Sequence, residues 1–439
     1  MIYFLIGLLQ LAFLSMFIVK SFKRLGLAVL GDGIKIMAML WLANIALYNM
    51  QFSDLYNPSW QINIMVLAIV LIFVIVSKKI YLTETDIIEN LEEIEKDKEN
   101  YKLYNLIINL VFLIAVIVFC INVKKYGLAI LSENKINKQP MDHYSGYIVY
   151  MLVLCAQFKY VIFRSYKRIL DLCVLVISIG VLILTLNRGP IAFIVAAIYI
   201  YEIFNLVRIK NQISKRKLYL IFIVLISVFL VFLQFFGVMG DMRMEYVLEN
   251  VYKTTINEHY GMSRFIPSGF LWGYMYLTSP LENAAYAIMN QTVEFTYFNN
   301  LLYPFVKLFA NIFGFGDQYK EWLIEKQGYV PYLEGEVGLN VSSFIPEAMQ
   351  DLGYLGLAVY IVLFILIAYF AVKLIRKKKI TAIGSILIYI NVLNILLWSV
   401  FGNSLKIPML ILNILFILFV EFLKNKKIFK VIYSKIKRG

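Results

Sequence analysis

Long apolar stretches recur along the chain and are separated by short polar segments. A helix needs about 20 mainly apolar residues to cross the hydrocarbon core of a bilayer. Stretches of this kind lie at 2–19, 34–50, 61–77, 104–122, 146–163, 170–186, 190–207, 218–237, 353–372, 382–402 and 408–423. They lack the alternation of apolar and polar residues that is typical of β-barrel strands. We therefore expect helices, which satisfy their backbone hydrogen bonds within one segment. The pattern predicts an all-α polytopic membrane protein with about eleven transmembrane helices.

The composition agrees with this pattern. The chain has 439 residues, of which 61% are hydrophobic and 16% charged, and its mean hydropathy is +0.76. A soluble domain is nearer to about 45–50% apolar and about 25% charged. A soluble enzyme, a disordered chain and a disulfide scaffold are therefore excluded. All three cysteines lie within apolar stretches, so no disulfide framework is expected outside them.

The net charge of +14 predicts the orientation of the chain. If the segment after the first stretch is cytoplasmic, 28 of the 42 Lys and Arg residues lie in cytoplasmic segments, most of which are short. The positive-inside rule is strongest for short loops. We therefore expect an external N-terminus, a cytoplasmic C-terminus and no nucleic-acid partner. The basic tail 424–439 is typical of segments that bind anionic membrane lipids.

Three regions follow from this topology. Residues 1–237 hold the first eight transmembrane helices, and they include an amphipathic cytoplasmic segment, 78–103, for which a solvated connector is the alternative. Residues 238–352 form one large exoplasmic loop. Residues 353–439 hold the last three transmembrane helices and the tail. Within the loop, 298–316 is apolar but interrupted by polar residues and Pro, which favours an interfacial or re-entrant helix over a twelfth span.

The motifs of soluble enzymes are missing. The sequence has no phosphate-binding GxxxxGK[ST] loop, no HExxH, no GxSxG and no CxxC. Its two histidines, His143 and His259, lie far apart in sequence. We therefore expect no metal site and no cofactor, and a reaction that consumes an already activated substrate.

The segment Asn187-Arg188-Gly189-Pro190 joins two apolar stretches almost without a loop. Pro190 suits a first helical turn, which would hold Arg188 at the outer membrane surface. A guanidinium there can bind a phosphate with two parallel hydrogen bonds. Snorkelling to the interface is the alternative. In the large loop, Arg264 is a second anion-binding candidate and His259 a candidate proton acceptor, although either can have an ordinary surface role.

A run from Asn340 to Gly356 leads into the ninth stretch. Glu347 and Asp351 are four residues apart and would share a helix face. One of these carboxylates could act as a general base for a sugar hydroxyl, with helix capping as the alternative. Gly353 and Gly356 would offer a small-residue surface for close helix packing.

Five charged residues lie within or at the ends of apolar stretches near the cytoplasmic side. Charge inside a membrane indicates function by default. For these positions we expect snorkelling of the side chains to the interface: Lys35, Lys159, Asp171, Glu202 and Glu421.

Three motifs together resemble the bacterial O-antigen polymerase family, also described as oligosaccharide repeat unit polymerases of the Wzy type. One is Arg188-Gly189 between two apolar stretches. Another is the segment from Gly273 to Leu281, which is similar to a Tyr-x-Tyr-x-x-x-Pro-Leu element of the family's large loop. The last is the run Asn340–Gly356. The order of these motifs and the late large loop also match the family.

The resemblance implies a membrane glycosyltransferase in the bacterial cytoplasmic (inner) membrane, with an active site facing the periplasm or exterior. The enzyme would transfer a growing O-antigen or capsule glycan from undecaprenyl pyrophosphate to a new lipid-linked repeat unit. A polysaccharide chain-length regulator is a possible protein partner. The catalytic candidates are Arg188, His259, Glu347 and Asp351. The substrate-binding candidates are Arg264, Tyr274, Tyr276, Asn340 and Ser343, although the two tyrosines could equally be interfacial anchors.

Two other functions stay open at this point. An O-antigen ligase also transfers a lipid-linked glycan, but to a different acceptor, and the Asp351-Leu352-Gly353 run favours the polymerase over it. A flippase or transporter for lipid-linked sugars would place polar residues along the membrane midplane and often repeats its halves. The sequence shows neither feature.

Overall fold

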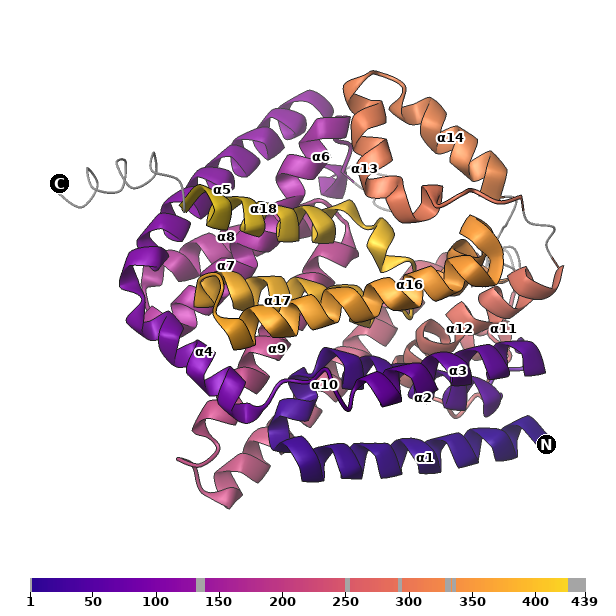
Figure 1. Ribbon diagram of the computed structural model, residues 1–439. Coiled ribbons are helices and arrows are strands. Elements are labelled where there is room, and N and C mark those ends of the chain that lie inside the picture. Colours follow the sequence, from indigo (N-terminus) through magenta and orange to yellow (C-terminus); the bar gives the residue numbers. More distant parts are fainter. Residues whose placement is uncertain are drawn as a thin grey trace. The chain divides into compact units, whose positions relative to one another are not determined.

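In the part of the chain that the structure describes, the regular secondary structure is helical (Figure 1). The computed structural model describes residues 2–131, 139–248, 253–290, 294–327, 333 and 337–424. No β-strand occurs in these ranges; an isolated antiparallel bridge joins Ser53 to Met262. The prediction of an all-α fold is confirmed.

The helices belong to two compact units. The first contains residues 1–81, 209–365 and 396–406, and the second contains 82–208, 366–395 and 407–439. The first unit holds α1 (Ile2–Leu25), η1 (Gly26–Gly31), α2 (Gly33–Asn49), α3 (Trp60–Val76), α10 (Lys215–Val247), α11 (Ile256–His259), α12 (Ser268–Asn290), α13 (Asn299–Ile312), α14 (Gly316–Gln327) and η4 (Ser404–Lys406). The second holds α4 (Glu84–Lys96), α5 (Lys98–Tyr126), η2 (Ala129–Leu131), α6 (His143–Tyr150), α7 (Leu152–Tyr166), α8 (Ile169–Leu184), α9 (Arg188–Ile209) and α18 (Pro408–Lys424). Three helices have residues in both units: α9, whose last residue Ile209 belongs to the first unit, α16 (Phe344–Lys377) and α17 (Ala382–Trp398).

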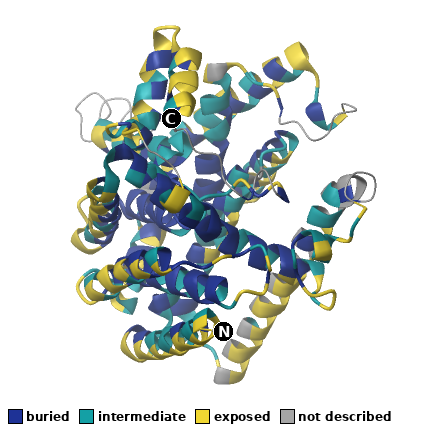
Figure 2. Cartoon of the chain, turned by 90° about the vertical axis from the view of Figure 1, so that its right-hand side faces the viewer, coloured by how far each residue is buried: buried dark blue, intermediate teal, exposed yellow. Residues whose placement is uncertain are grey.

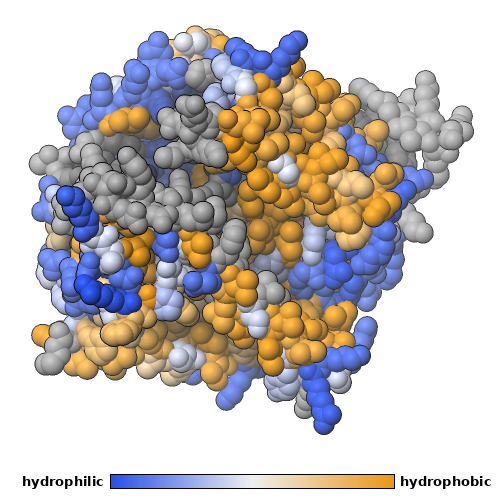
Figure 3. Space-filling view, turned by 180° about the vertical axis from the view of Figure 1, so that it is seen from behind, coloured by the Kyte–Doolittle hydropathy of each residue, from blue (hydrophilic) through white to orange (hydrophobic). Residues whose placement is uncertain are grey.

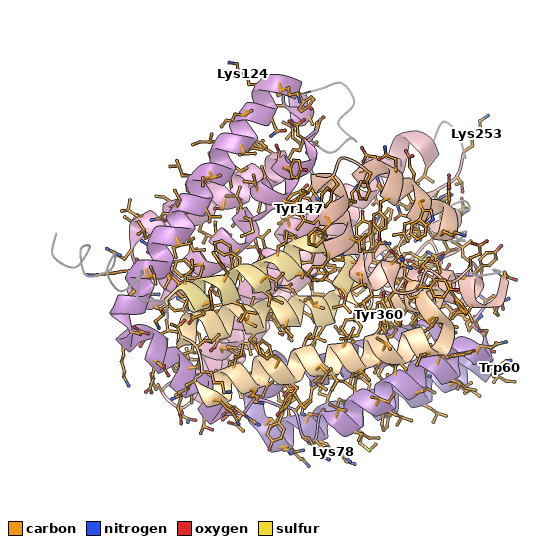
Figure 4. The ribbon with its side chains drawn as sticks, turned by 45° about the horizontal axis from the view of Figure 1, so that its top comes forward. Trp60, Lys78, Lys124, Tyr147, Lys253 and Tyr360 are labelled. Atoms are coloured by element: carbon orange, nitrogen blue, oxygen red, sulfur yellow. The ribbon has the colours of Figure 1, made fainter. Side chains whose placement is uncertain are left out.

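Every one of the eleven predicted stretches lies on a helix or on a pair of consecutive helices. Within the described ranges, five helical segments are long and apolar enough to cross a membrane: Ile2–Gly31, Tyr101–Leu131, Tyr144–Tyr166, Gly189–Ile209 and Phe344–Lys377. Shorter apolar helices include α2, α3, α8 and α17. In Figure 4, Trp60 marks the start of α3, and Lys78 lies two residues beyond its end. The number of crossings and the orientation stay predictions.

Much of the protein's surface is apolar. Figure 2 shows exposed residues along the outward sides of the helices, with buried residues between them, and apolar side chains cover much of the face visible in Figure 3. The helix α1 illustrates this: Leu5 is 53% exposed and Leu9 71% exposed. An apolar surface of this extent is compatible with a membrane protein, because apolar side chains are unfavourable in contact with water but not in contact with lipid tails.

The first three helices are joined by buried amides. The Asn49 side chain on α2 donates hydrogen bonds to Gln10 Oε1 (2.9 Å) on α1 and to Asn63 Oδ1 (2.6 Å) on α3. The Asn63 side chain in turn donates a hydrogen bond to Asn49 Oδ1 at 3.0 Å. Polar side chains that bond across apolar helices hold them in one register.

The charged residues predicted to snorkel are instead largely buried and paired. Lys35 is 2% exposed and donates to the Ser77 carbonyl at 2.6 Å. Lys159 and Asp171 form an ion pair at 2.7 Å with side chains that are 2% and 4% exposed. The snorkelling prediction was wrong for these residues, because it considered each side chain alone. A buried charge requires a partner, and packing supplies one.

Both glutamates of this set are paired as well, but only Glu421 is buried; the Glu202 side chain is 31% exposed, so its predicted snorkelling is not contradicted. Glu421 is 4% exposed and accepts hydrogen bonds from the hydroxyls of Tyr104 (2.5 Å) and Thr381. Glu202 binds Arg164 with both carboxylate oxygens, at 2.6 and 2.8 Å. These contacts lie within the second unit and stabilise its helix packing.

The predicted amphipathic segment 78–103 contains α4. Thr83 and Asp86 form a capping box at its start, in which each side chain accepts a hydrogen bond from the other residue's backbone. Ile87, Leu91 and Ile94 are buried. The helical spacing of the sequence is therefore confirmed, and the apolar face of α4 packs against protein.

The helices α10 and α12 approach each other closely at two glycines. A Cβ atom added at Gly237 would collide with the backbone of Gly269, and one added at Gly269 would lie 2.7 Å from Gln234 Oε1. Contacts of this kind let the backbones pack without intervening side chains.

Replacing Gly237 by Ala should therefore lower the thermal midpoint of the purified protein, because α10 and α12 must move apart. Overpacking of this kind costs about 1–3 kcal/mol. The matched control is Gly180→Ala on α8, where an added Cβ meets nothing within 4 Å. Thermal unfolding followed by circular dichroism measures both variants, and equal midpoints would contradict the proposed close approach.

The large loop predicted at 238–352 is mostly helical. It contains the end of α10, then α11, α12, α13 and α14, and the first turns of α16. The start of α16 differs from the prediction. This helix begins at Phe344, nine residues before the expected start of the ninth apolar stretch. The early turns carry the carboxylates that the sequence singled out.

Candidate functional site

The start of α16 is fixed by polar contacts to its backbone. The Ser343 hydroxyl accepts a hydrogen bond from the Ile345 N–H at 3.4 Å, which caps the helix, and Phe344 N–H donates to the Ser399 carbonyl at 3.2 Å. Ser343 is 1% exposed. The structure thus places this substrate-binding candidate in a capping position. Asn340, in contrast, is exposed just before the helix.

Helix α16 is kinked directly after Asp351. Leu352 has φ −163° and ψ 43°, and Gly353 has φ 61° and ψ −144°, a conformation that is essentially restricted to glycine. A Cβ atom on Gly356 would collide with the Ala348 carbonyl. The two glycines therefore allow the kink. The expectation that they pack against a neighbouring helix was wrong, because their space is filled by α16 itself and by Phe295, whose ring lies 3.7 Å from a Cβ placed on Gly353.

Asp351 is fully buried and organises the start of α13. Its carboxylate accepts hydrogen bonds from the backbone N–H groups of Asn300 and Leu301, both at 3.0 Å. It also accepts from the Thr296 hydroxyl at 2.5 Å and the Tyr360 hydroxyl at 2.8 Å. A carboxylate at a helix N-terminus satisfies free N–H groups and complements the helix dipole.

Glu347, one turn earlier on the same face, is partly exposed and forms an ion pair with Lys406. The Lys406 ammonium lies 3.0 Å from Glu347 Oε1, and the two side chains are 21% and 20% exposed. Asn403 donates to Glu347 Oε2 at 2.8 Å. Lys406 also donates to Asn300 Oδ1 at 3.2 Å, which connects the ion pair to α13.

The polar cluster around this pair includes atoms that no neighbour satisfies. Within the described residues, the buried Asn403 Oδ1 and Ser404 Oγ have no hydrogen-bond partner. The Asn403 amide group donates to Glu347 and to the Tyr360 hydroxyl at 3.1 Å. Tyr360 lies on α16 (Figure 4) and is buried. We call this set, Glu347, Lys406, Asn403, Ser404, Asn300 and Tyr360, the α16 cluster.

The tyrosine motif of the large loop lies on α12. Tyr274 is buried; its hydroxyl accepts a hydrogen bond from the Phe52 N–H at 3.0 Å, and its ring lies 5.7 Å from that of Tyr56. Tyr276 is less buried and lies 6.0 Å from Trp272, centroid to centroid. Tyr274 therefore packs the interior of the first unit, and Tyr276 belongs to its more accessible side.

Glu282 on α12 is a buried carboxylate that the sequence did not single out. It is 5% exposed and accepts hydrogen bonds from the Tyr48 hydroxyl at 2.5 Å and the Asn57 N–H at 3.1 Å. Burial raises the pKa of Glu282 above its usual value. No local motif distinguishes this residue from a surface glutamate, so only packing reveals it.

His259 and Arg264 lie at the short helix α11 and the turn after it. Arg264 is exposed and donates to Glu258, and this hydrogen bond lowers the pKa of Glu258 to about 2. Burial lowers the pKa of His259 below its usual value. The His259 ring lies 5.0 Å from Tyr260, whose ring lies 5.2 Å from Trp272. This aromatic row continues to Tyr276.

Arg188 is the first residue of α9, in the second unit. Its side chain lies outside the described part of the structure, as does that of His143. The structure therefore brings together Glu347, Asp351 and Ser343 on α16, and separately His259 and Tyr276 through the aromatic row.

Sequence reasoning missed most partners of the two carboxylates. Lys406, the partner of Glu347, lies 59 residues after it, and Asn300, a partner of Asp351, lies 51 residues before it. The available signal for Lys406 was its position as a single basic residue in a segment predicted to be external. Among the described residues, no group of three or more His, Cys, Asp or Glu residues could hold a metal ion.

Comparisons with protein-family models, with curated proteins and with solved structures found no match for this chain.

Proposed function

We propose that this chain polymerises oligosaccharide repeat units carried on undecaprenyl pyrophosphate, at the outer face of a bacterial cytoplasmic membrane. The observation that carries the proposal is the partly exposed Glu347–Lys406 pair at the start of α16, a helix long and apolar enough to cross a membrane. The pair lies on the run Asn340–Gly356, one of the three motifs behind the family resemblance.

In the proposed reaction, a sugar hydroxyl of the new lipid-linked unit attacks the anomeric carbon of the growing glycan. The new carbon–oxygen bond forms while the bond from that carbon to the pyrophosphate oxygen breaks. The leaving undecaprenyl pyrophosphate keeps the electron pair, so no nucleotide or metal is required as a reactant. Glu347 accepts the hydroxyl proton, since a general base must lie at a surface that the acceptor can reach.

Lys406 supports this role in two ways. Its hydrogen bond holds the Glu347 carboxylate in one orientation. An ammonium group has three N–H donors, and Glu347 and Asn300 accept two of them. In the proposal the third N–H donates to a phosphate oxygen of the substrate, from an ammonium that also lies 5.2 Å from the centre of the Tyr303 ring.

Asp351 has a different role in this proposal. Its carboxylate oxygens are saturated by four hydrogen bonds and it is buried, so it positions α13 and Tyr360 without touching substrate. For Arg188 we keep the role that the sequence suggested, which is to stabilise the negative charge that develops on the leaving group. That role rests on its place between two apolar stretches and on guanidinium–phosphate chemistry.

The proposal is tested with the full chain purified in detergent and reconstituted in lipid. The probe is the pool of undecaprenyl-pyrophosphate oligosaccharides extracted from a strain of the source bacterium that lacks this chain, supplied without nucleotide sugar. We expect a ladder of longer glycans. Arg188→Ala should slow its formation about 100-fold, because one lost preorganised donor costs that much. Arg216→Ala, an exposed arginine at the start of α10, is the control and should form the ladder at the normal rate.

Each negative result has a definite meaning. Absence of a ladder with the unmodified chain would refute the polymerase function. Transfer only to an acceptor that is not an undecaprenyl lipid would indicate an O-antigen ligase. Movement of the lipid-linked units across the bilayer without glycan transfer would indicate a flippase. A normal ladder with Arg188→Ala would refute only the role of that arginine.

A further inference from the structure

Helix α13 is amphipathic in the reverse sense of a helix in a soluble protein. Such a helix normally buries its apolar side and exposes its polar side. Here the polar residues face inward: Asn300 is 0% exposed, Lys307 8% and Asn311 9%. The large apolar residues face outward, and they are Leu302, Phe305, Phe309 and Ile312, followed by Phe313 and Phe315 in the turn to α14.

Hydrogen bonds fix this orientation. The Asn300 side chain donates to Thr296 Oγ1 at 3.1 Å and to Gln350 Oε1 at 3.3 Å. The Lys307 ammonium donates to the Gly316 carbonyl at 2.5 Å and lies 3.5 Å from Asp317. The helices α13 and α14 therefore pack as a hairpin, visible in Figure 1, whose inner side is polar. Turning α13 to hide its phenylalanines would break these bonds.

Further exposed rings lie beside α16, next to the start of α13. Phe295 lies against the kink at Gly353 and is 46% exposed. Tyr297 and Tyr354 are each 71% exposed, and Leu355 is 60% exposed. Aromatic residues of this kind gather where a membrane meets water. Together with the outward side chains of α13 they form what we call the α13 face.

The dimensions of α13 match a helix that lies in the membrane surface. Its 14 residues span about 21 Å, shorter than the roughly 30 Å hydrocarbon core, so it cannot cross a bilayer. An interfacial helix instead inserts one apolar side among the acyl chains and keeps its other side polar. The hydrogen bonds from α13 to Asp351 place its start at the end of a helix of membrane-spanning length.

We propose that the α13 face is embedded in the lipid interface of the bilayer, beside the kinked end of α16. The occupant of this surface is lipid, because the face includes exposed residues of an apolar helix that itself requires lipid. In this position α13 holds the α16 cluster at the membrane surface through Asn300, which binds Lys406. The membrane contact is independent of the reaction proposed above.

The test measures the surroundings of a spin label on the full chain in phospholipid nanodiscs. Cys120, Cys155 and Cys173 are replaced by Ala, and Phe309→Cys is labelled. Because Phe309 is exposed, the label should not disturb folding. We expect the label to collide several-fold more often with oxygen, which concentrates in lipid, than with a water-soluble nickel chelate. Gln318→Cys on α14 is the control; it is exposed on a polar helix and should favour the nickel chelate.

The outcomes separate the alternatives. Preference for oxygen at Phe309 and, in a second variant, at Ile312→Cys supports the proposal. Preference for the nickel chelate at both sites would show a water-exposed face and overturn it. Protection from both reagents would show that protein, such as a second copy of the chain, covers the face, and this would also overturn it. None of these readouts requires glycan transfer.

Discussion

Replacing Glu347 by Gln should slow glycan ladder formation by about 100- to 10,000-fold, the range that a general base contributes. The amide keeps the shape of the side chain and can still accept a hydrogen bond from Asn403, but it cannot take up the acceptor proton at neutral pH. The thermal midpoint should change little, since a partly exposed ion pair contributes about 1 kcal/mol or less. Activity and stability should thus separate in this variant.

The control for this variant is Glu321→Gln on α14, an exposed carboxylate outside the α16 cluster, which should leave the ladder unchanged. Rates are measured in a single turnover with saturating lipid-linked units, and midpoints by thermal unfolding in the same detergent. A normal rate in Glu347→Gln would remove Glu347 from the mechanism. A slow rate accompanied by a large fall in the midpoint would indicate a structural role instead.

Replacing Asp351 by Ala should have the opposite signature, with a large loss of stability. The variant leaves the N–H groups of Asn300 and Leu301 and the hydroxyls of Thr296 and Tyr360 without their acceptor. Each buried donor left unsatisfied costs about 1–3 kcal/mol. A total of about 3 kcal/mol or more is expected, because α13 loses its cap and the kinked end of α16 loses its anchor.

Asp351→Asn retains one carbonyl oxygen and should lose roughly half as much stability. The control is Asp317→Ala in the first turn of α14, where the side chain is 62% exposed. Its loss should stay below about 1 kcal/mol. The measurement is the shift in the midpoint of thermal unfolding. If Asp351→Ala keeps the normal midpoint but forms no ladder, Asp351 is a catalytic group and our assignment of a positioning role is wrong.

The elements that sequence reasoning predicted well are those set by local chemistry. Continuous runs of Leu, Ile, Val and Phe form helices wherever they occur, and the spacing of Ile87, Leu91 and Ile94 predicts α4 and its buried side. The four-residue spacing of Glu347 and Asp351 likewise places both on one face of α16. Each of these inferences depends on residues within one or two helical turns.

The prediction failed where a residue's role depends on a distant partner. The sequence suggested the role of a general base for either Glu347 or Asp351. In the structure, Asp351 is buried and caps a helix, whereas Glu347 is partly exposed and paired with Lys406. Lys159 and Asp171 are paired with each other and do not snorkel. The kink at Gly353 could not be inferred either, because a glycine permits its unusual backbone angles without requiring them.

The sequence by itself therefore determined the all-helical fold, the apolar helices compatible with a membrane and the short list of polar residues that chemistry would need. Only the tertiary structure decided which carboxylate is exposed, which cation accompanies it and which side of α13 faces outward. The physical reason is that hydropathy and helix spacing act locally along the chain. The environment of Glu347, in contrast, is set by Asn403 and Lys406, which lie 56 and 59 residues away along the chain and meet it only when the helices pack.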